Sequence, residues 1–142
     1  MKKRLLAMLL AVVLVVALLP LQSQAAEARA SRYLTYYGGS AATGASSGQV
    51  KVTVSIVANG KMTRIGAEKI MLYRASDDSL YKTVWGTTGN GMMFTNTASA
   101  SGSVTISAEP GVTYYCKVTA YAKNATGYDS KTFMTNTATA KS

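Results

Sequence analysis

The 142-residue chain contains no histidine and only one cysteine, Cys116. Histidine is the most common general base and metal ligand, so its absence excludes Ser–His and Cys–His nucleophiles and imidazole metal sites. A single cysteine excludes a disulfide within the chain, and a small domain without disulfides must be held together by its core alone. The composition therefore argues against most hydrolytic and metal chemistry.

Acidic side chains are also scarce, six against 15 basic ones. Asp77 and Asp78 are the only adjacent carboxylates, and because a calcium site needs about six to eight oxygen ligands we interpret them as turn residues. Glu68 and Glu109 could each pair with an aspartate as the acid and nucleophile of a glycosidase. Glu109, however, precedes Pro110 in a turn, and nothing in the sequence brings a second carboxylate near it. We predict no catalytic, cofactor-binding or metal site.

The N-terminus has the three parts of a secretory signal peptide. They are a basic start at residues 2–4, an apolar run at residues 5–19 and small residues at cleavage spacing, at 23–25 or 28–30. The apolar run is shorter than the ~20 residues that a membrane-spanning helix needs. We predict a signal peptide over residues 1–30, cleaved after Ala25 or Ala30, and a single secreted domain over residues 31–142. No stable membrane anchor is expected after cleavage.

Beyond residue 30 the chain has 11 basic and five acidic residues, a net charge of +6. The basic residues are spread along the sequence and never form a run, which is typical of a solubility requirement. A weak attraction to anionic glycans, cell-wall polymers or lipid headgroups is the functional alternative. Nucleic acid is not expected as a partner, since no binding motif is present and export opposes it.

The strongest periodic signal lies in residues 110–122, where a Pro-Gly turn leads into a long alternating segment. One face carries Tyr114, Cys116, Val118 and Ala120, and the other carries Tyr115, Lys117, Thr119 and Tyr121. Such alternation predicts a strand of an antiparallel sheet with the first set buried. Cys116 is then an inert core residue and not a reactive thiol.

Six further segments have strand character. They lie near residues 32–37, 49–58, 69–74, 80–86, 102–108 and 129–137. The Gly/Ser/Ala tract of residues 38–48 predicts a flexible loop, and residues 87–101 predict a long loop or a short strand. Asn59-Gly60 indicates a tight turn, and residues 61–67 fit either a helical turn or an irregular segment. With no convincing helix, we predict an all-β sandwich of about seven antiparallel strands.

Trp85 and Tyr81 are the best candidates for stacking on a sugar or a peptide, because flat aromatic faces suit amphipathic ligands. The pattern of residues 80–86 places both on one face of their strand. The more frequent role of a tryptophan at such a position is to cap the core, and we favour that interpretation. The ligand-binding residues therefore stay unknown.

The string Pro110-Gly111-x-x-Tyr114-x-Cys116-x-Val118-x-Ala120 resembles strand F of fibronectin type III and immunoglobulin-like domains. The resemblance implies that Tyr114 forms a tyrosine corner by hydrogen-bonding back to the turn near Pro110, and that Cys116 lies in the core. The strand at residues 49–58 offers no cysteine to pair with Cys116, and Trp85 does not occupy the immunoglobulin position. The broader sandwich class is the better supported expectation.

Residues 31–140 also resemble a group of short, uncharacterised secreted proteins of clostridial-type Gram-positive gut bacteria. The segments that carry this resemblance are Gly60-Lys-Met62-x-x-Ile65-Gly66-Ala67-x-x-Ile70-x-Leu72-Tyr73, Gly91-Met92-Met93, and the strand from Gly111-x-x-Tyr114 to Asp129-Ser-Lys-Thr132. It implies a fibronectin-like or immunoglobulin-like fold and no particular chemistry.

We therefore expect a secreted, non-catalytic binding or surface-interaction module. Its partner would be an extracellular glycan, wall polymer or protein, bound by edge strands and end loops, chiefly residues 38–48 and 87–101. The first alternative is a cationic secreted effector that acts on membranes or cell walls. A small hydrolase is the second and weaker alternative, because histidine is missing.

Overall fold

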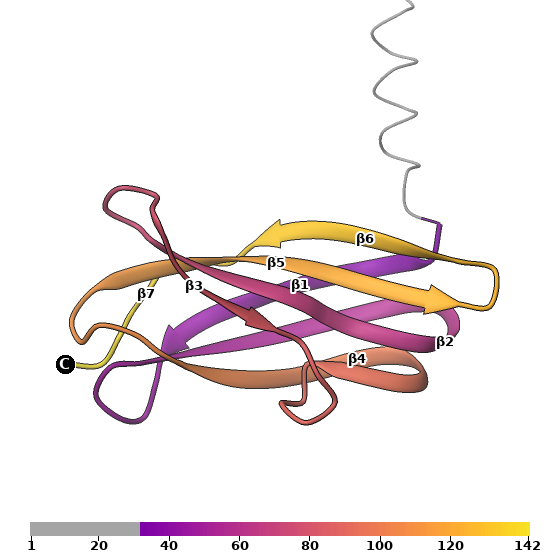
Figure 1. The fold of residues 1–142 in the computed structure, drawn as a ribbon, viewed down its shortest axis with the longest axis horizontal. Coiled ribbons are helices and arrows are strands. Elements are labelled where there is room, and N and C mark those ends of the chain that lie inside the picture. Colours follow the sequence, from indigo (N-terminus) through magenta and orange to yellow (C-terminus); the bar gives the residue numbers. More distant parts are fainter. Residues whose placement is uncertain (1–31) are drawn as a thin grey trace, which may run out of the picture. The chain divides into compact units, whose positions relative to one another are not determined.

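The computed structural model describes residues 32–142, and the predicted signal peptide with its two cleavage positions lies outside the described residues. The described part contains seven strands and no helix (Figure 1). The strands are β1 (Leu34–Thr43), β2 (Gln49–Arg74), β3 (Leu80–Trp85), β4 (Met93–Ser107), β5 (Thr113–Asn124), β6 (Gly127–Met134) and β7 (Ala138–Thr139).

All strand pairs are antiparallel and belong to one sheet, in which β1, β2, β5 and β6 are successive neighbours. β3 and β4 also pair with β2, and β7 pairs with β5. The sheet is curled into a half-barrel around a single core. The prediction of an all-β antiparallel fold with about seven strands is confirmed.

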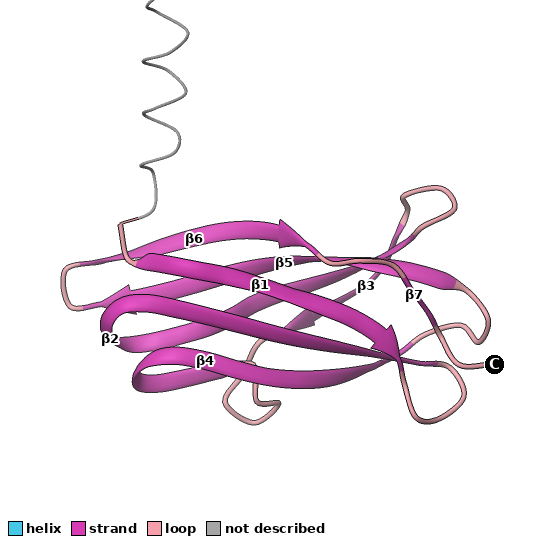
Figure 2. Cartoon of the chain, turned by 180° about the vertical axis from the view of Figure 1, so that it is seen from behind, coloured by secondary structure: helices cyan, strands magenta, loops and turns pink. Residues whose placement is uncertain are grey.

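β2 is 26 residues long and runs through both halves of the curled sheet. Residues 49–57 lie between β1 and β4, whereas residues 64–74 pair with β5 and, over 69–73, with β3. β2 and β4 curve round together at the same end of the sheet (Figure 2). At this bend β2 advances from Val57 to Met62 while β4 moves only from Ser99 to Thr97, so the register shifts.

The bend corrects two expectations from the sequence. Asn59-Gly60 lies inside the bent strand, and neither residue is among the positive-φ residues of the described chain. The chain turns there without the two-residue turn that an Asn-Gly pair indicates. Residues 61–67 continue the strand and form no helical turn.

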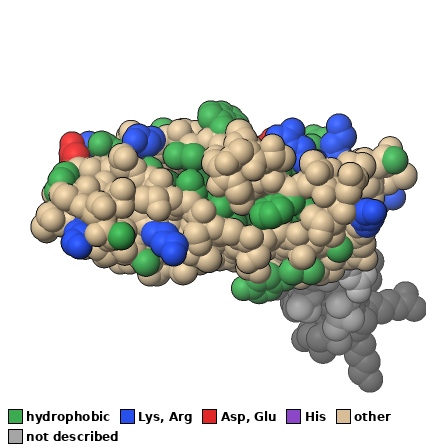
Figure 3. Space-filling model, turned by 90° about the horizontal axis from the view of Figure 1, so that it is seen from below, with side chains coloured by type: hydrophobic (Ala, Val, Ile, Leu, Met, Phe, Trp, Pro, Cys, Tyr) green, Lys and Arg blue, Asp and Glu red, His purple; other side chains and the backbone are tan. Residues whose placement is uncertain are grey.

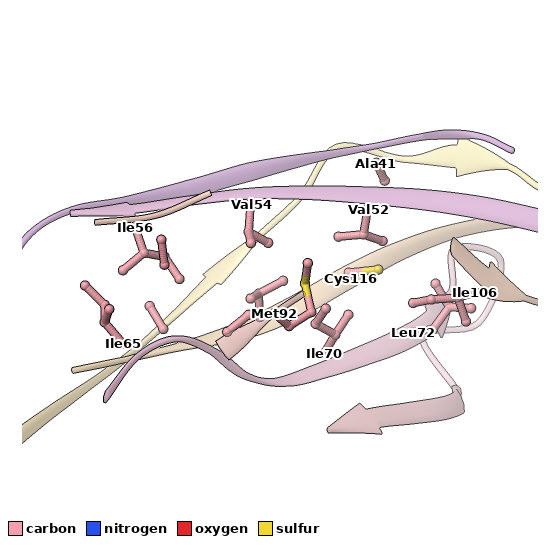
Figure 4. Packing of buried hydrophobic residues seen from close by; sticks show 14 of the residues in the cluster. Ala41, Val52, Val54, Ile56, Ile65, Ile70, Leu72, Met92, Ile106 and Cys116 are labelled. Atoms are coloured by element: carbon pink, nitrogen blue, oxygen red, sulfur yellow. The ribbon is translucent and has the colours of Figure 1, made fainter. Parts of the chain in front are cut away.

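The core lies between the two halves of β2. Val52, Val54 and Ile56 point inward from the first half, and Ile65, Ile70 and Leu72 from the second (Figure 4). Cys116 and Met92 fill the space between them, each with 0% exposure. Burying each large aliphatic side chain contributes roughly 1.5–3 kcal/mol, and this contribution holds a domain that has no disulfide.

The alternation predicted for β5 is confirmed. Tyr114, Cys116, Val118 and Ala120 are all 0% exposed, while the residues between them are partly exposed. The backbone N–H of Glu109 donates a hydrogen bond to the Tyr114 hydroxyl at 3.1 Å. The tyrosine corner expected at this turn is therefore formed.

The C-terminal segment closes the gap between β1 and β5. The side-chain amide of Asn136 accepts a hydrogen bond from the Ala41 N–H at 2.8 Å and donates one to the Ala41 carbonyl at 3.0 Å. Ala140 is 0% exposed and donates its N–H to the Val112 carbonyl at 2.9 Å. Asn136 thus occupies the outer edge of β1 in the way that a neighbouring strand would.

Both loops predicted as contact surfaces are largely strands. Residues 38–43 belong to β1, in register with residues 50–55 of β2, so the Gly/Ser/Ala tract is not a flexible loop over that range. Residues 93–101 belong to β4, which leaves a loop only over residues 86–92. Small residues permit strand pairing when a long neighbour supplies the ladder, and β2 does so here. The last major strand is also shorter than predicted, because β6 ends at Met134.

Candidate functional site: the outer face of β3, β2, β5 and β6

Trp85 is the most exposed large side chain of β3, with 62% of its surface accessible. It lies directly opposite Lys69 of β2, and the Lys69 ammonium nitrogen is 5.6 Å from the centre of the indole ring. A cation at this distance from an aromatic face is attracted by the ring quadrupole. The interpretation that Trp85 caps the core is wrong, because its indole lies on the outer face of the sheet.

Tyr81 does not share the face of Trp85, so the predicted pair of stacking residues is separated. The register between β2 and β3 shifts at Leu72/Tyr73, and this irregularity turns Tyr81 toward the core. Its ring centre lies 5.4 Å from that of Tyr114, at an interplanar angle of 50°. A simple alternation over residues 80–86 cannot reveal a bulge, because the bulge depends on the neighbouring strand.

A second aromatic group lies at the other end of the same face. Tyr73 of β2 and Tyr115 of β5 are directly paired and stacked, with ring centres 5.5 Å apart and an interplanar angle of 11°. The Lys117 ammonium lies 5.0 Å from the centre of the Tyr73 ring. The Tyr115 hydroxyl donates to the Asp78 carboxylate at 2.8 Å, and this hydrogen bond raises the pKa of Tyr115. These contacts fix the rings as a platform at the surface.

A third ring pair extends the face over β5 and β6. Tyr121 and Tyr128 stack with ring centres 5.9 Å apart, and Tyr128 is 66% exposed. Met134 at the end of β6 is 61% exposed. We use "aromatic face" for the outer surface formed by Lys69, Met71, Tyr73, Thr83, Trp85, Tyr115, Lys117, Thr119, Tyr121, Tyr128 and Met134. The strands that carry it, β2, β3, β5 and β6, are labelled in Figure 1.

The basic residues of the aromatic face are not neutralised by neighbouring acids. Arg74 and Glu109 form an ion pair at 3.5 Å, and this pair lies outside the aromatic face. Neither Lys69 nor Lys117 has a carboxylate oxygen within 4.0 Å among residues 32–142. Their ammonium groups are in contact with aromatic rings and solvent.

The adjacent aspartates considered from the sequence, Asp77 and Asp78, have structural roles. Asp77 accepts hydrogen bonds from the Ser79 hydroxyl at 2.6 Å and the Ser79 N–H at 3.1 Å, and these bonds lower the pKa of Asp77. Asp78 has a φ of 57°, a left-handed conformation typical of turns. The turn interpretation of this pair is confirmed. No group of three His, Cys, Asp or Glu side chains that would hold a metal ion occurs in the described part of the chain.

Cys116 is buried, as predicted, and has no access to solvent. Desolvation raises the pKa of its thiol to about 12, although the contact with Thr135 opposes the shift. A thiol with so high a pKa is almost entirely protonated at neutral pH and is a poor nucleophile. The backbone N–H of Cys116 donates a hydrogen bond to the Thr135 hydroxyl at 3.0 Å, and this bond connects β5 to the segment that follows β6.

Among residues 32–142, no helix is long and apolar enough to cross a membrane. Comparison of the chain with protein-family models, with curated proteins and with solved structures finds no match in any of the three. The geometry of the aromatic face is therefore the basis on which a function is proposed.

Proposed function

We propose that this protein is a secreted, non-catalytic binding module that holds an extended extracellular glycan on the aromatic face. The observation that carries the proposal is the exposure of the Trp85 indole beside the ammonium of Lys69. An indole that leaves 62% of its surface in water loses free energy that burial would provide. A sugar ring whose apolar face covers the indole would recover part of it.

The shape of the surface agrees with an extended ligand. The aromatic face is built on paired strands, so its rings are held by ladder hydrogen bonds and by cross-strand stacking. Tyr73, Tyr115, Tyr121 and Tyr128 all take part in ring pairs that fix their orientation. A rigid, open platform with several rings suits a polymer better than a small molecule, which binds in an enclosed pocket.

The proposal includes no chemical step. Asp77 and Asp78 are engaged in a turn, and Glu109 forms an ion pair with Arg74. Glycoside hydrolysis requires two carboxyl groups placed on either side of the substrate bond. A binding role needs only the rings and the lysines.

For the fold, we propose an immunoglobulin-like or fibronectin type III-like sandwich as the finer description of the curled sheet. The hydrogen bond between Glu109 and Tyr114 supports it, as does the burial of Cys116 on the same strand. We also propose that the chain is related to the short secreted proteins of clostridial-type bacteria. The Gly91-Met92-Met93 segment, part of that resemblance, leads into β4 and places Met92 in the core.

The alternative function, a cationic effector that acts on membranes or cell walls, is supported by the net charge of +6 beyond residue 30. Lys and Arg side chains are dispersed among hydrophobic and polar ones on the face that Figure 3 shows, without a single cluster. Dispersed charge gives weak, salt-sensitive association. Sedimentation with anionic vesicles at low salt tests this alternative, and the absence of binding there would exclude it.

A glycan array tests the main proposal with three proteins: the unchanged protein, Trp85→Ala and Tyr36→Ala. Tyr36 is the matched control, because it is 56% exposed on β1, away from the aromatic face. We expect Trp85→Ala to lose binding while Tyr36→Ala retains it, with both variants melting close to the parent. A blank array, or binding that Trp85→Ala does not weaken, would contradict the proposal.

A further inference from the structure

The aromatic face contains two cation–ring units, one between β2 and β3 and one between β2 and β5. In the first, Lys69 lies over Trp85 at 5.6 Å, and in the second Lys117 lies over Tyr73 at 5.0 Å. In the ladder Lys69 is opposite Thr119 and Lys117 is opposite Met71. The two lysines are therefore diagonal neighbours on adjacent strands, a relationship that brings side chains within roughly 7–8 Å of each other.

Both lysines carry a positive charge, and within residues 32–142 neither ammonium group has a carboxylate oxygen within 4.0 Å. The rings are weak partners, since an exposed cation–π contact is a weaker attraction than a charge-assisted hydrogen bond to a carboxylate. Asp78, the acid at the tyrosine end of the face, accepts a hydrogen bond from the Tyr115 hydroxyl and pairs with neither lysine. Both ammonium groups are therefore available to an anion beside two flat aromatic surfaces.

We propose, on the basis of the function proposed above, that the ligand is an acidic polysaccharide built of pyranose rings. Its sugar rings lie against Trp85 and against the Tyr73–Tyr115 stack, and its carboxylates are bound by Lys69 and Lys117. The rings account for the sugar, because the C–H face of a pyranose covers an aromatic face. The lysines account for the acidic groups of the ligand, because hydrogen bonds between an ammonium group and a carboxylate are stronger than those between neutral groups.

The combination favours an acidic glycan over two simpler ligands. A neutral glycan satisfies the rings and leaves the two ammonium groups without anions. A polyol phosphate chain supplies anions, but it has no ring to cover the indole of Trp85. An acidic glycan is the one class that uses both kinds of side chain at both units.

The experiment compares acidic polysaccharides with their own neutral forms. Polygalacturonate, alginate and hyaluronan are each tested beside the carboxyl-reduced polymer, which keeps the sugar backbone and loses the charge, and polyglycerol phosphate is tested as an anion without rings. The full protein is compared with the double variant Lys69→Gln/Lys117→Gln. Lys51→Gln is the matched control, because Lys51 is an exposed lysine on the first half of β2, paired with Ala42 and Thr105.

We expect at least one acidic polymer to bind about tenfold or more tightly than its reduced form at low salt, and less tightly as salt rises. The double variant should remove this preference while keeping the weaker, Trp85-dependent binding, and Lys51→Gln should change neither. Equal binding of acidic and reduced polymers overturns this inference and leaves the proposed glycan function intact. Binding to polyglycerol phosphate alone, or to none of the polymers, overturns both.

Discussion

The hydroxyl of Tyr114 accepts a hydrogen bond from the backbone N–H of Glu109, at 3.1 Å, across the turn that contains Pro110 and Gly111. Tyr114 is completely buried, and its ring contacts that of Tyr81. The bond ties the first residues of β5 to the turn that precedes them. It also satisfies a backbone donor that would otherwise lose its partner when the chain folds.

Tyr114→Phe removes this bond and leaves the ring in place. We expect the free energy of unfolding to fall by about 1–2 kcal/mol, because a partly buried hydrogen bond is lost and the N–H loses its acceptor. Denaturant unfolding measures the change. The control is Tyr115→Phe, which removes a hydroxyl whose hydrogen bond to Asp78 is exposed to solvent, and stability should stay nearly unchanged. A Tyr114→Phe variant as stable as the parent would show that the corner bond does not contribute.

Gly66→Ala tests the tight contact between β2 and the start of β4. Gly66 has a φ of 155°, and a methyl group there would lie 2.0 Å from the Met92 carbonyl oxygen. We expect a loss of about 2–4 kcal/mol from strain and displaced backbone. Gly60→Ala on the same strand is the control, because no atom lies within 4 Å of its added methyl group. The melting temperatures of both variants are measured. Equal values for Gly66→Ala and Gly60→Ala would contradict the predicted strain at Gly66.

The buried thiol predicts a loss of stability at high pH. The folded pKa of Cys116 is about 12, against an ordinary value of 9.0, so the native state holds the proton more tightly than the unfolded chain. The stabilisation is complete below pH 9 and is lost as the pH rises toward 12. Each pH unit inside this window removes about 1.4 kcal/mol.

Lysines and tyrosines titrate in the same range, so the comparison uses Cys116→Ala. We expect the unfolding free energy of the parent to fall more steeply between pH 9 and pH 11 than that of the variant. Parallel curves would mean that the thiol is not the cause. Below pH 9 the native thiol should also resist a thiol-specific reagent until the protein is unfolded.

Asn136→Ala tests the closure of the β1 edge. The variant loses one donor and one acceptor to Ala41, at 3.0 and 2.8 Å, so we expect about 1–3 kcal/mol of destabilisation. Hydrogen exchange at the Ala41 amide should accelerate by more than the global change requires. Asn136→Asp keeps the acceptor and loses the donor, so its stability should lie between those of the parent and Asn136→Ala. Unchanged protection at Ala41 would contradict the bridging role.

Trp85 is the only tryptophan in the chain, so its fluorescence reports its position directly. With 62% of its surface accessible, the indole should emit close to free tryptophan in water and be quenched efficiently by acrylamide. A core-capping tryptophan would emit at shorter wavelength and resist quenching. If the aromatic face binds a glycan, the bound ligand should shift the emission to shorter wavelength and protect the ring.

The alternation of side chains was sufficient to predict the buried set of β5 from Tyr114 to Ala120. The outward placement of Tyr115 and Lys117 follows from the same period of two. The corner bond of Tyr114 was expected from the resemblance of this strand to strand F of fibronectin type III and immunoglobulin-like domains. These features are local, and the information for them lies within about ten neighbouring residues.

The aromatic face could not be predicted in the same way, because it depends on register between strands. Lys69 meets Trp85, and Tyr73 meets Tyr115, only through pairings across separate segments of the chain. Tyr81 does not lie on the aromatic face, because the register shift at Leu72/Tyr73 interrupts the alternation of side chains along β3. The wrong prediction of a loop over residues 38–48 has the same cause. Residues 38–43 are a strand because they pair with β2, and the Gly/Ser/Ala composition alone does not indicate this pairing.

The continuity of β2 determines how the domain gains and loses its structure. One strand, β2, supplies hydrogen-bonding partners to both halves of the curled sheet. We therefore expect the two halves to form together and not one after the other. Bonds such as that between Asn136 and Ala41 join residues 95 positions apart, so folding requires the closure of long loops. Domains dominated by such distant pairings fold on the millisecond-to-second scale. The buried amides in the two halves of β2 should accordingly exchange their hydrogens with the same free energy of opening, because they exchange when the whole sheet opens.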